Sequence, residues 1–134
     1  MPTLDARRTL FAAAAAMALA VLLGAFGAHA LKNLLAPDAL AVWQTGVQYH
    51  AWHALGLFGI GLWRRTAPDD RELRVAAWLL LGGIALFSGS LYALALSGVR
   101  SIGLVTPFGG LAFVAGWAAV ARSALRLRTG PPPV

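Results

Sequence analysis

Residues 43–63, WQTGVQYHAWHALGLFGIGLW, decide how this chain folds. The stretch contains no Asp, Glu, Lys, Arg or Pro, and it begins and ends with tryptophan. As an α-helix rising 1.5 Å per residue, it covers about 30 Å from Trp43 to Trp63, which is the thickness of the hydrocarbon core of a bilayer. Tryptophan concentrates at membrane surfaces, so the stretch predicts a transmembrane helix with His53 at the midplane.

This helix begins before Trp43. Pro37 and Asp38 suit a first helical turn, because proline needs no hydrogen-bond partner there and a carboxylate meets the positive end of the helix dipole. No further breaker occurs until Pro68. We therefore expect one helix over about 38–63.

Three more apolar stretches are long enough to span a bilayer. They predict helices at about 9–31, 74–97 and 107–126, the last with Thr106 as cap and Pro107 in the first turn. Residues 1–126 would form a single transmembrane domain, and 127–134 a short disordered tail. The chain is 59% apolar and 12% charged, with mean hydropathy +0.71, which also indicates a membrane protein. The predicted fold class is an all-α bundle of four transmembrane helices.

Charged residues fall almost entirely in the connections between these helices. With the N-terminus in the cytoplasm, nine of the eleven cationic residues lie on that side and only Lys32 and Arg100 lie outside. This bias predicts that both termini are cytoplasmic. The nine are Arg7, Arg8, Arg64, Arg65, Arg71, Arg74, Arg122, Arg126 and Arg128.

Composition also excludes several functions. The chain has no cysteine, which rules out disulfides, Cys-ligated zinc and iron–sulfur clusters. The formal charge is +6, but the arginines are scattered between apolar blocks rather than clustered on one surface. We therefore expect no nucleic-acid partner.

The stretch 24–31, GAFGAHAL, allows two interpretations. Arg7 and Arg8 before an apolar run and Ala28-His29-Ala30 after it resemble a signal peptide with its cleavage site. The apolar run is about 20 residues, longer than the 7 to 15 of a signal peptide, which favours a helix that stays in the membrane. We expect His29 to remain in the mature protein.

Small residues form stripes along three of the predicted helices. Such stripes let helix backbones approach closely within lipid, although an Ala- and Gly-rich composition would also produce them. The stripes are Gly24 with Ala28; Gly82, Gly89 and Ala93; and Gly109, Ala112, Gly116 and Ala119.

Polar side chains gather in the outer half of the predicted bundle and predict a cleft that opens outward. Helical phase places Thr45, Tyr49 and His53 on one face, with His50 beside His53. Three roles stay open: hydrogen bonds between helices, a site for a ligand or cofactor, and movement of protons or solutes. The candidate cleft residues are His29, Gln48, Tyr49, His50, His53, Ser88, Ser90 and Tyr92.

Metal and cofactor chemistry has little support in this pattern. Haem needs facing axial ligands, and His29 near the surface is poorly placed to pair with His53. A metal needs three or four clustered ligands, and no carboxylate accompanies the histidines. A lipid or quinone needs only an apolar slot with one or two polar contacts. We expect no metal, and haem and quinone have weak support as cofactors.

Four stretches together resemble the YgdD-like family of small four-helix membrane proteins: GAFGAHAL, WQTGVQYHAWHAL, FSGSLYAL and TPFGGLAFVAGW. The resemblance covers roughly residues 24–117. It implies an uncleaved protein of the bacterial inner membrane, related to a small mitochondrial transmembrane protein. The family has no assigned function, so the resemblance implies no catalytic role.

The expected function is that of an accessory or assembly partner of a larger inner-membrane complex, without enzyme activity. The alternative is a binder of a hydrophobic small molecule (lipid, quinone or, with less support, haem) in the outward-facing cleft. The expected partners are the bilayer and another membrane protein or a second copy of this chain.

Overall fold

The computed structural model describes residues 5–127, and the regular structure in this range is entirely helical. This confirms the predicted all-α class. The segments α3, η2 and α4 follow one another without a break, so the chain makes four long rods. The predicted tail lies almost wholly outside the described residues. The elements are α1 Ala6–His29, η1 Leu31–Asn33, α2 Pro37–Trp63, α3 Arg71–Gly83, η2 Ile84–Ser88, α4 Gly89–Ser97, η3 Arg100–Leu104 and α5 Thr106–Leu125.

Two helices begin three residues earlier than predicted, because polar capping residues extend them beyond their apolar stretches. Asp5 caps α1 by accepting a hydrogen bond from the Arg8 N–H at 2.8 Å. Asp70 caps α3 through the N–H groups of Glu72 and Leu73. Carboxylates at these positions satisfy backbone donors that have no partner within the helix.

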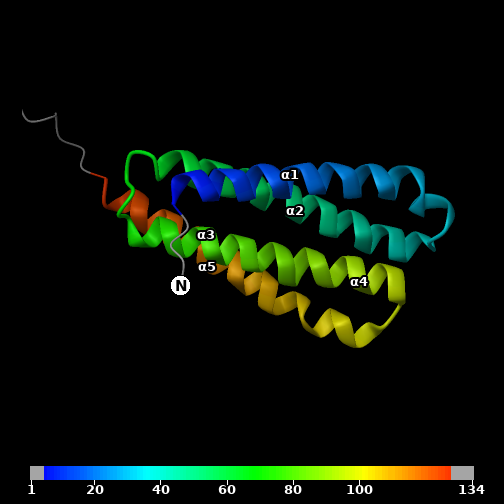
Figure 1. The fold of residues 1–134 in the computed structure, drawn as a ribbon. Coiled ribbons are helices and arrows are strands. Elements are labelled where there is room, and N and C mark those ends of the chain that lie inside the picture. Colours follow the sequence, from blue (N-terminus) through cyan, green and yellow to red (C-terminus); the bar gives the residue numbers. More distant parts are fainter. Residues whose placement is uncertain (1–4, 128–134) are drawn as a thin grey trace, which may run out of the picture.

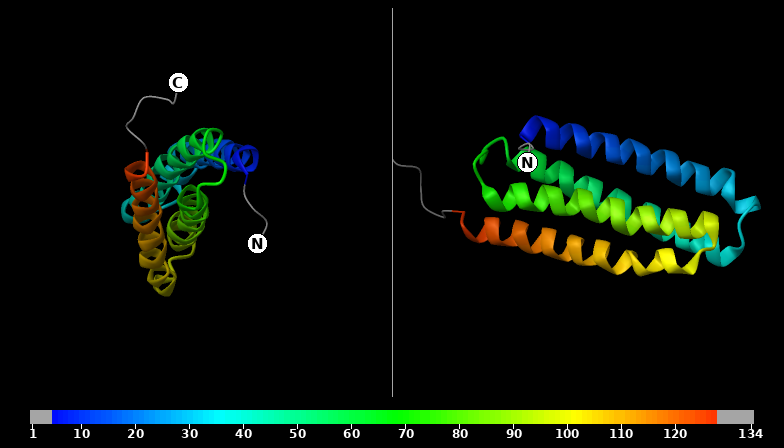
Figure 2. Two further views of the ribbon diagram at one scale, coloured as in Figure 1. Left: turned by 90° about the vertical axis from the view of Figure 1, so that its left-hand side faces the viewer. Right: turned by 60° about the horizontal axis from the view of Figure 1, so that its bottom comes forward.

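The four rods lie side by side and alternate in direction (Figure 1). α1 packs against α2, α2 packs against α3 and α4, and α3 packs against α5. Figure 2 shows α1 and α5 at opposite edges, with the other two rods between them. We call the end that holds Asp5, the 64–70 loop and Leu127 the termini end, and the other the loop end. α2 is therefore a central helix, enclosed on several sides.

The core contains mostly small and medium side chains, whereas large apolar side chains point outward. Ala54, Leu57 and Leu80 are fully buried. By contrast, Phe11 is 76% exposed and Leu111 66% exposed, and similar residues occur on all four rods. Small residues inside and large apolar residues outside are the pattern of helices that pack in lipid.

Three helical stretches within residues 5–127 are long and apolar enough to cross a membrane: Ala6–Asn33, Arg71–Ser97 and Arg100–Leu125. α2 is not one of them, although it has 27 residues. The difference lies in Gln48, Tyr49, His50 and His53, which lower its mean hydropathy. Polar residues on a central helix are compatible with a span if its neighbours cover them.

The predicted small-residue stripe on α5 is a contact surface. A Cβ on Gly109 would clash with the backbone of Phe87, and a Cβ on Gly116 would lie 2.8 Å from Leu80 Cδ2. Leu80 and Phe87 belong to α3 and η2, so the glycines let α5 approach this rod closely.

The predicted stripe of Gly82, Gly89 and Ala93 is wrong as an internal contact. No atom lies within 4 Å of a Cβ built on Gly82 or Gly89, and Ala93 is exposed. α3 instead packs through Leu73, Ala76, Ala77, Leu80 and Gly83, which recur at helical spacing and leave Gly82 off the contact face. Beyond Gly83 the π-helical turn η2 changes the spacing and rotates the faces of α4.

Candidate functional site

A groove with aromatic walls lies between α2 and α5, and we call it the α2–α5 groove. η2 contacts both helices and contributes Phe87 to the lining. The cavity has a volume of about 710 Å³ and opens to the outside past Leu111 and Val114, which are 66% and 67% exposed. Its lining residues are Tyr49, His53, Phe87, Pro107, Gly110, Leu111, Phe113, Val114 and Trp117.

The walls of the groove are stacked and tilted rings. The imidazole of His53 stacks on Phe113, with ring centroids 3.4 Å apart and planes 11° apart. Phe87 lies 4.5 Å from Tyr49 and 5.6 Å from Phe113 between centroids. These rings come from α2, η2 and α5, so all three elements build the site.

His53 brings a hydrogen-bonding group into these aromatic surroundings. His53 is 6% exposed, and its Nδ1 lies 2.6 Å from the carbonyl oxygen of Tyr49, one turn earlier in α2. A carbonyl only accepts, so Nδ1 carries the proton and donates it. Among residues 5–127 no hydrogen-bond partner is present for Nε2. In the neutral imidazole this nitrogen is an acceptor.

The groove has a closed end and an open end. Trp117 packs over Gly56 of α2, where a Cβ would lie 2.7 Å from Trp117 Cζ2, and this contact closes the groove toward the termini end. Pro107 lines the opposite end, in the first turn of α5. Ten residues of α5 separate the two, which is about 15 Å.

His50 lies on a different side of α2 from the groove. Its Nδ1 is 3.1 Å from the Tyr92 hydroxyl of α4, and Tyr92 in turn packs on Trp43 with centroids 4.7 Å apart. Trp43 Nε1 donates to the Leu23 carbonyl of α1 at 3.0 Å. These contacts link three rods in one layer, which is a packing role.

The remaining candidate residues lie elsewhere. Ser90 bonds to Thr106 at 2.7 Å and donates to the Phe87 carbonyl. Ser88 is fully buried. His29 and Gln48 are exposed. Of the eight residues predicted to line one polar cleft, the structure thus places only Tyr49 and His53 in the groove.

No sequence pattern singled out Phe87, Phe113 or Trp117, which also line the groove. Phe113 and Trp117 are four apart and so share a face of α5, which is a signal for a paired aromatic surface. Phe87 gave no such signal, because its direction depends on the π-helical turn of η2. π-Helical turns inside α-helices occur often at functional sites.

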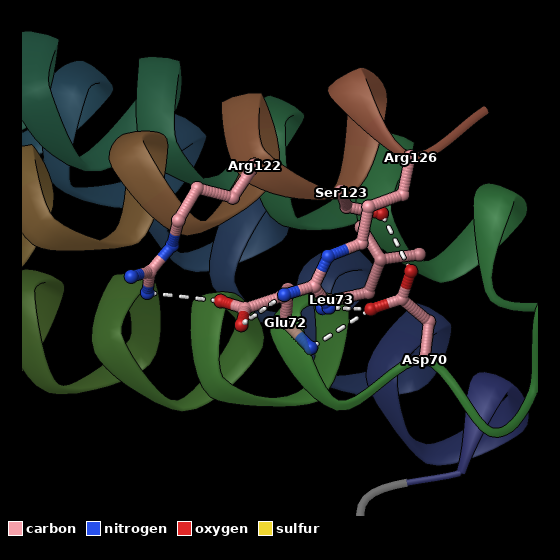
Figure 3. A network of polar contacts seen from close by, with 6 residues as sticks. All are labelled: Asp70, Glu72, Leu73, Arg122, Ser123 and Arg126. Carbon is pink, nitrogen blue, oxygen red and sulfur yellow. Dashed lines mark hydrogen bonds and ion pairs between the residues drawn. The ribbon is translucent and has the colours of Figure 1, made fainter.

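A second polar network clamps α3 to α5 at the termini end (Figure 3). Ser123 donates to Asp70 at 2.6 Å, and Glu72 pairs with Arg122 at 2.9 Å and with Arg126 at 3.5 Å. In Figure 3 the side chains of Arg122 and Ser123 of α5, and of Arg126 just after it, point toward the start of α3. Of these residues, only Arg122 and Arg126 entered the sequence analysis, as members of the cationic group on the cytoplasmic side.

This network lowers the pKa of the Asp70 carboxyl group. Burial alone would raise its pKa. The hydrogen bonds from Ser123 and from two backbone N–H groups, together with the charge of Arg126, outweigh burial and hold the pKa of Asp70 below its ordinary value. The charged form is therefore the one that the fold favours.

A buried arginine joins the first two rods at the same end. Arg64 is 3% exposed, and its Nη1 donates to Thr9 Oγ1 of α1 at 3.1 Å. Thr9 itself donates to the Asp5 carbonyl at 2.8 Å. Both networks are structural, since neither lines the α2–α5 groove.

Long apolar helices with large apolar side chains on their outer surface define the chain as a helical membrane protein. Residues 23–110 match the family described as "Protein of unknown function (DUF423)". The chain is 44% identical to the UPF0382 membrane protein YwdK of Bacillus subtilis over 108 residues, which cover 81% of this chain and 88% of the relative. It is 40% identical to the UPF0382 inner membrane protein YgdD of Escherichia coli over 114 residues, 81% and 82% of the two chains.

The chain therefore belongs to this family of membrane proteins, which confirms the YgdD-like resemblance. No solved structure matches it. The family match includes all of α2 and η2 and ends at Gly110 in α5, so it contains the part of the groove that holds Tyr49, His53 and Phe87.

Proposed function

We propose that all four rods cross the bacterial inner membrane, with the termini end in the cytoplasm. The distribution of cationic residues supports this orientation. Lys32 and Arg100 belong to the loop end, in η1 and η3. All other cationic residues among 5–127 belong to the termini end: Arg7, Arg8, Arg64, Arg65, Arg71, Arg74, Arg122 and Arg126.

The burial of its polar residues supports the inclusion of α2 among the spans. His50 and His53 are 3% and 6% exposed, so neighbouring rods shield them from lipid. Gln48 is exposed but lies in the half of α2 nearer the loop end. A histidine that faces other helices is tolerated at membrane depth.

The function that the geometry supports best is binding of a hydrophobic small molecule of the lipid or quinone class in the α2–α5 groove. The observation that carries it is a cavity of about 710 Å³ with aromatic walls and one buried imidazole. Ligand sites are mostly apolar clefts of about 300 to 1,000 Å³ with few polar groups. Because Leu111 and Val114 line the open side, the ligand would enter from the bilayer.

The groove favours binding over catalysis. Of its lining residues, only Tyr49, His53 and Trp117 carry polar side-chain atoms, and none is charged. An acid–base or nucleophilic mechanism needs a second group oriented against the first. The imidazole of His53 is oriented by a backbone carbonyl and stacks on a phenyl ring instead.

A groove-filling substitution tests the binding function. Gly110 lines the groove, and Leu at this position would occupy it. Gly59 is a matched control, because nothing lies within 4 Å of a Cβ built there. We expect mass spectrometry to find an apolar molecule in organic extracts of the purified wild-type protein and the Gly59→Leu variant, and to find it lost from Gly110→Leu. Equal content in all three would contradict the proposal.

A second candidate function is that of an accessory partner in a membrane complex. Gly82 and Gly89 support it, because they leave the outer surface of α3 and α4 open to close approach by another helix. In native membranes, Ala93→Cys next to this surface, labelled with a photoactivatable thiol-reactive cross-linker, should then give a cross-linked adduct on irradiation. Adding Gly89→Leu should abolish the adduct and adding Gly59→Leu should not. Absence of any adduct would reject this candidate.

A further inference from the structure

We infer that the ligand of the α2–α5 groove has a planar ring with a hydroxyl group that donates a hydrogen bond to Nε2 of His53, as a quinol or another phenolic lipid does. The inference rests on the proposed binding function and adds the chemistry of the ligand's head. It follows from the tautomer of His53, the nature of the walls and the depth of the site.

The tautomer determines which head group fits. Nδ1 donates its hydrogen bond to the Tyr49 carbonyl oxygen 2.6 Å away, so the neutral ring has only the lone pair of Nε2 left to offer a ligand. His53 lines the groove, so this acceptor is within reach of a ligand there, and a hydroxyl donor would satisfy it in apolar surroundings. A quinone carbonyl or an ester oxygen can only accept, so it would leave Nε2 unmatched.

The walls favour a flat ring over a flexible chain. Phe87 and Phe113 lie 5.6 Å apart between centroids, and Trp117 lies 6.3 Å from His53. Aromatic rings attract each other in offset or edge-to-face arrangements at such separations. A planar head group placed among them gains contacts of the same kind.

The depth of His53 argues against a phospholipid head. Ten residues of α2 separate His53 from Trp43, about 15 Å along the helix, so a spanning α2 places the imidazole near the bilayer midplane. A charged head group at that depth is costly, whereas a neutral phenolic ring is not. An attached chain would leave past Leu111 and Val114 into the lipid.

The experiment measures binding of three probes to the purified full-length protein in mild detergent by isothermal titration calorimetry. The probes are decylhydroquinone kept reduced under anaerobic conditions, its dimethyl ether, and 1-decanol. One hydrogen bond corresponds to about tenfold in affinity. We expect decylhydroquinone to bind the wild type about tenfold more tightly than either other probe.

Variants test whether the imidazole of His53 causes this difference in affinity between the probes. His53→Leu should bind decylhydroquinone as weakly as the wild type binds the ether. His50→Leu should keep the wild-type preference, because His50 faces Tyr92 and not the groove. Comparison of the probes on the wild type needs no variant, so a misfolded variant does not prevent the test.

Each other outcome overturns part of the proposal. If the ether binds as tightly as the hydroquinone, the donor to Nε2 is wrong, while the groove remains a binding site. If 1-decanol binds as tightly, the planar ring is wrong. If His53→Leu still prefers decylhydroquinone, the role of His53 is wrong. If no probe binds, the phenolic head group is wrong, and if Gly110→Leu also keeps the extracted molecule, the binding function itself fails.

Discussion

His50 and His53 are three residues apart in α2, yet they serve different neighbours. His50 bonds to Tyr92 of α4, and His53 stacks on Phe113 of α5. Helical periodicity predicts that the two lie near each other on one face. On a central helix, two residues that differ by a small angle around the helix axis can face different neighbouring helices. The spacing of residues in the sequence does not show which neighbour each one faces.

The hydroxyl of Tyr92 should stabilise the fold, and that of Tyr49 should not. Tyr92→Phe removes the bond to His50, and hydrogen bonds between membrane helices contribute about 0.6 to 1.7 kcal/mol. Tyr49→Phe is the matched control, since no side-chain hydrogen bond of Tyr49 is present among residues 5–127. Thermal unfolding in detergent should show a lower midpoint for Tyr92→Phe alone. Equal midpoints would contradict the role of the His50–Tyr92 pair.

Asp70 should make stability depend on pH in the acid range. Its pKa is lower in the folded state than in the unfolded chain, so its stabilisation is complete above the ordinary aspartate value of about 4. The stabilisation is then lost as the pH falls from there through the lowered folded-state pKa.

Asp70→Asn isolates this effect, because Asn caps a helix well and does not titrate. The difference in unfolding midpoint between the wild type and this variant should shrink as the pH falls below about 4. Asp69→Asn removes an exposed carboxylate next to it and serves as the control. A difference that stays constant with pH would show that the charge of Asp70 is not involved.

At the scale of helices, hydropathy predicts which residues form a rod, but it does not predict which of the glycines in that rod contact a neighbouring rod. The stripe on α5 was predicted correctly, because Gly109 and Gly116 face the α3 rod. The stripe with Gly82 and Gly89 was wrong, because buried leucines and alanines set the contact face of α3 and the π-helical turn rotates the faces of α4. Spacing alone cannot distinguish a packed small face from an open one.

Substitution by alanine should therefore lower the stability of the fold at Gly109 but not at Gly89. Gly109→Ala forces a methyl group into the backbone of Phe87, and overpacking costs about 1 to 3 kcal/mol. Gly89→Ala meets open space and should be neutral or stabilise by about 0.5 to 1 kcal/mol through helix propensity. Unfolding in detergent compares the two variants. A stable Gly109→Ala would show that the rods can separate without cost.

α1 should remain part of the mature protein. Its contacts run along its length, from Thr9 with Arg64 to Gly27, where a Cβ would lie 2.7 Å from the Trp43 ring. Cleavage after Ala30 would remove all of them. Intact-mass measurement of the protein from native membranes should include residues 5–30, and a mature N-terminus at Leu31 would contradict this.

At the scale of the whole molecule, the sequence predicted the helical class, the four rods and the family. The groove could not be predicted, because it depends on distances between rods far apart in the chain. His53 and Tyr49 were predicted by their polarity in an apolar helix, whereas Phe87 and Trp117 look like ordinary apolar residues. Only the placement of α2 against η2 and α5 makes a site of them.

The depth of the site depends on whether α2 crosses the membrane, and labelling of single cysteines tests this directly. The chain has no native cysteine, so Asn33→Cys before α2 and Asp69→Cys after it each provide one exposed label position. We expect a membrane-impermeant maleimide to label Asn33→Cys in bacteria with a permeabilised outer membrane and an intact inner membrane. The same reagent should label Asp69→Cys only in inverted membrane vesicles. Labelling of both positions from the same side would show that α2 does not span the bilayer.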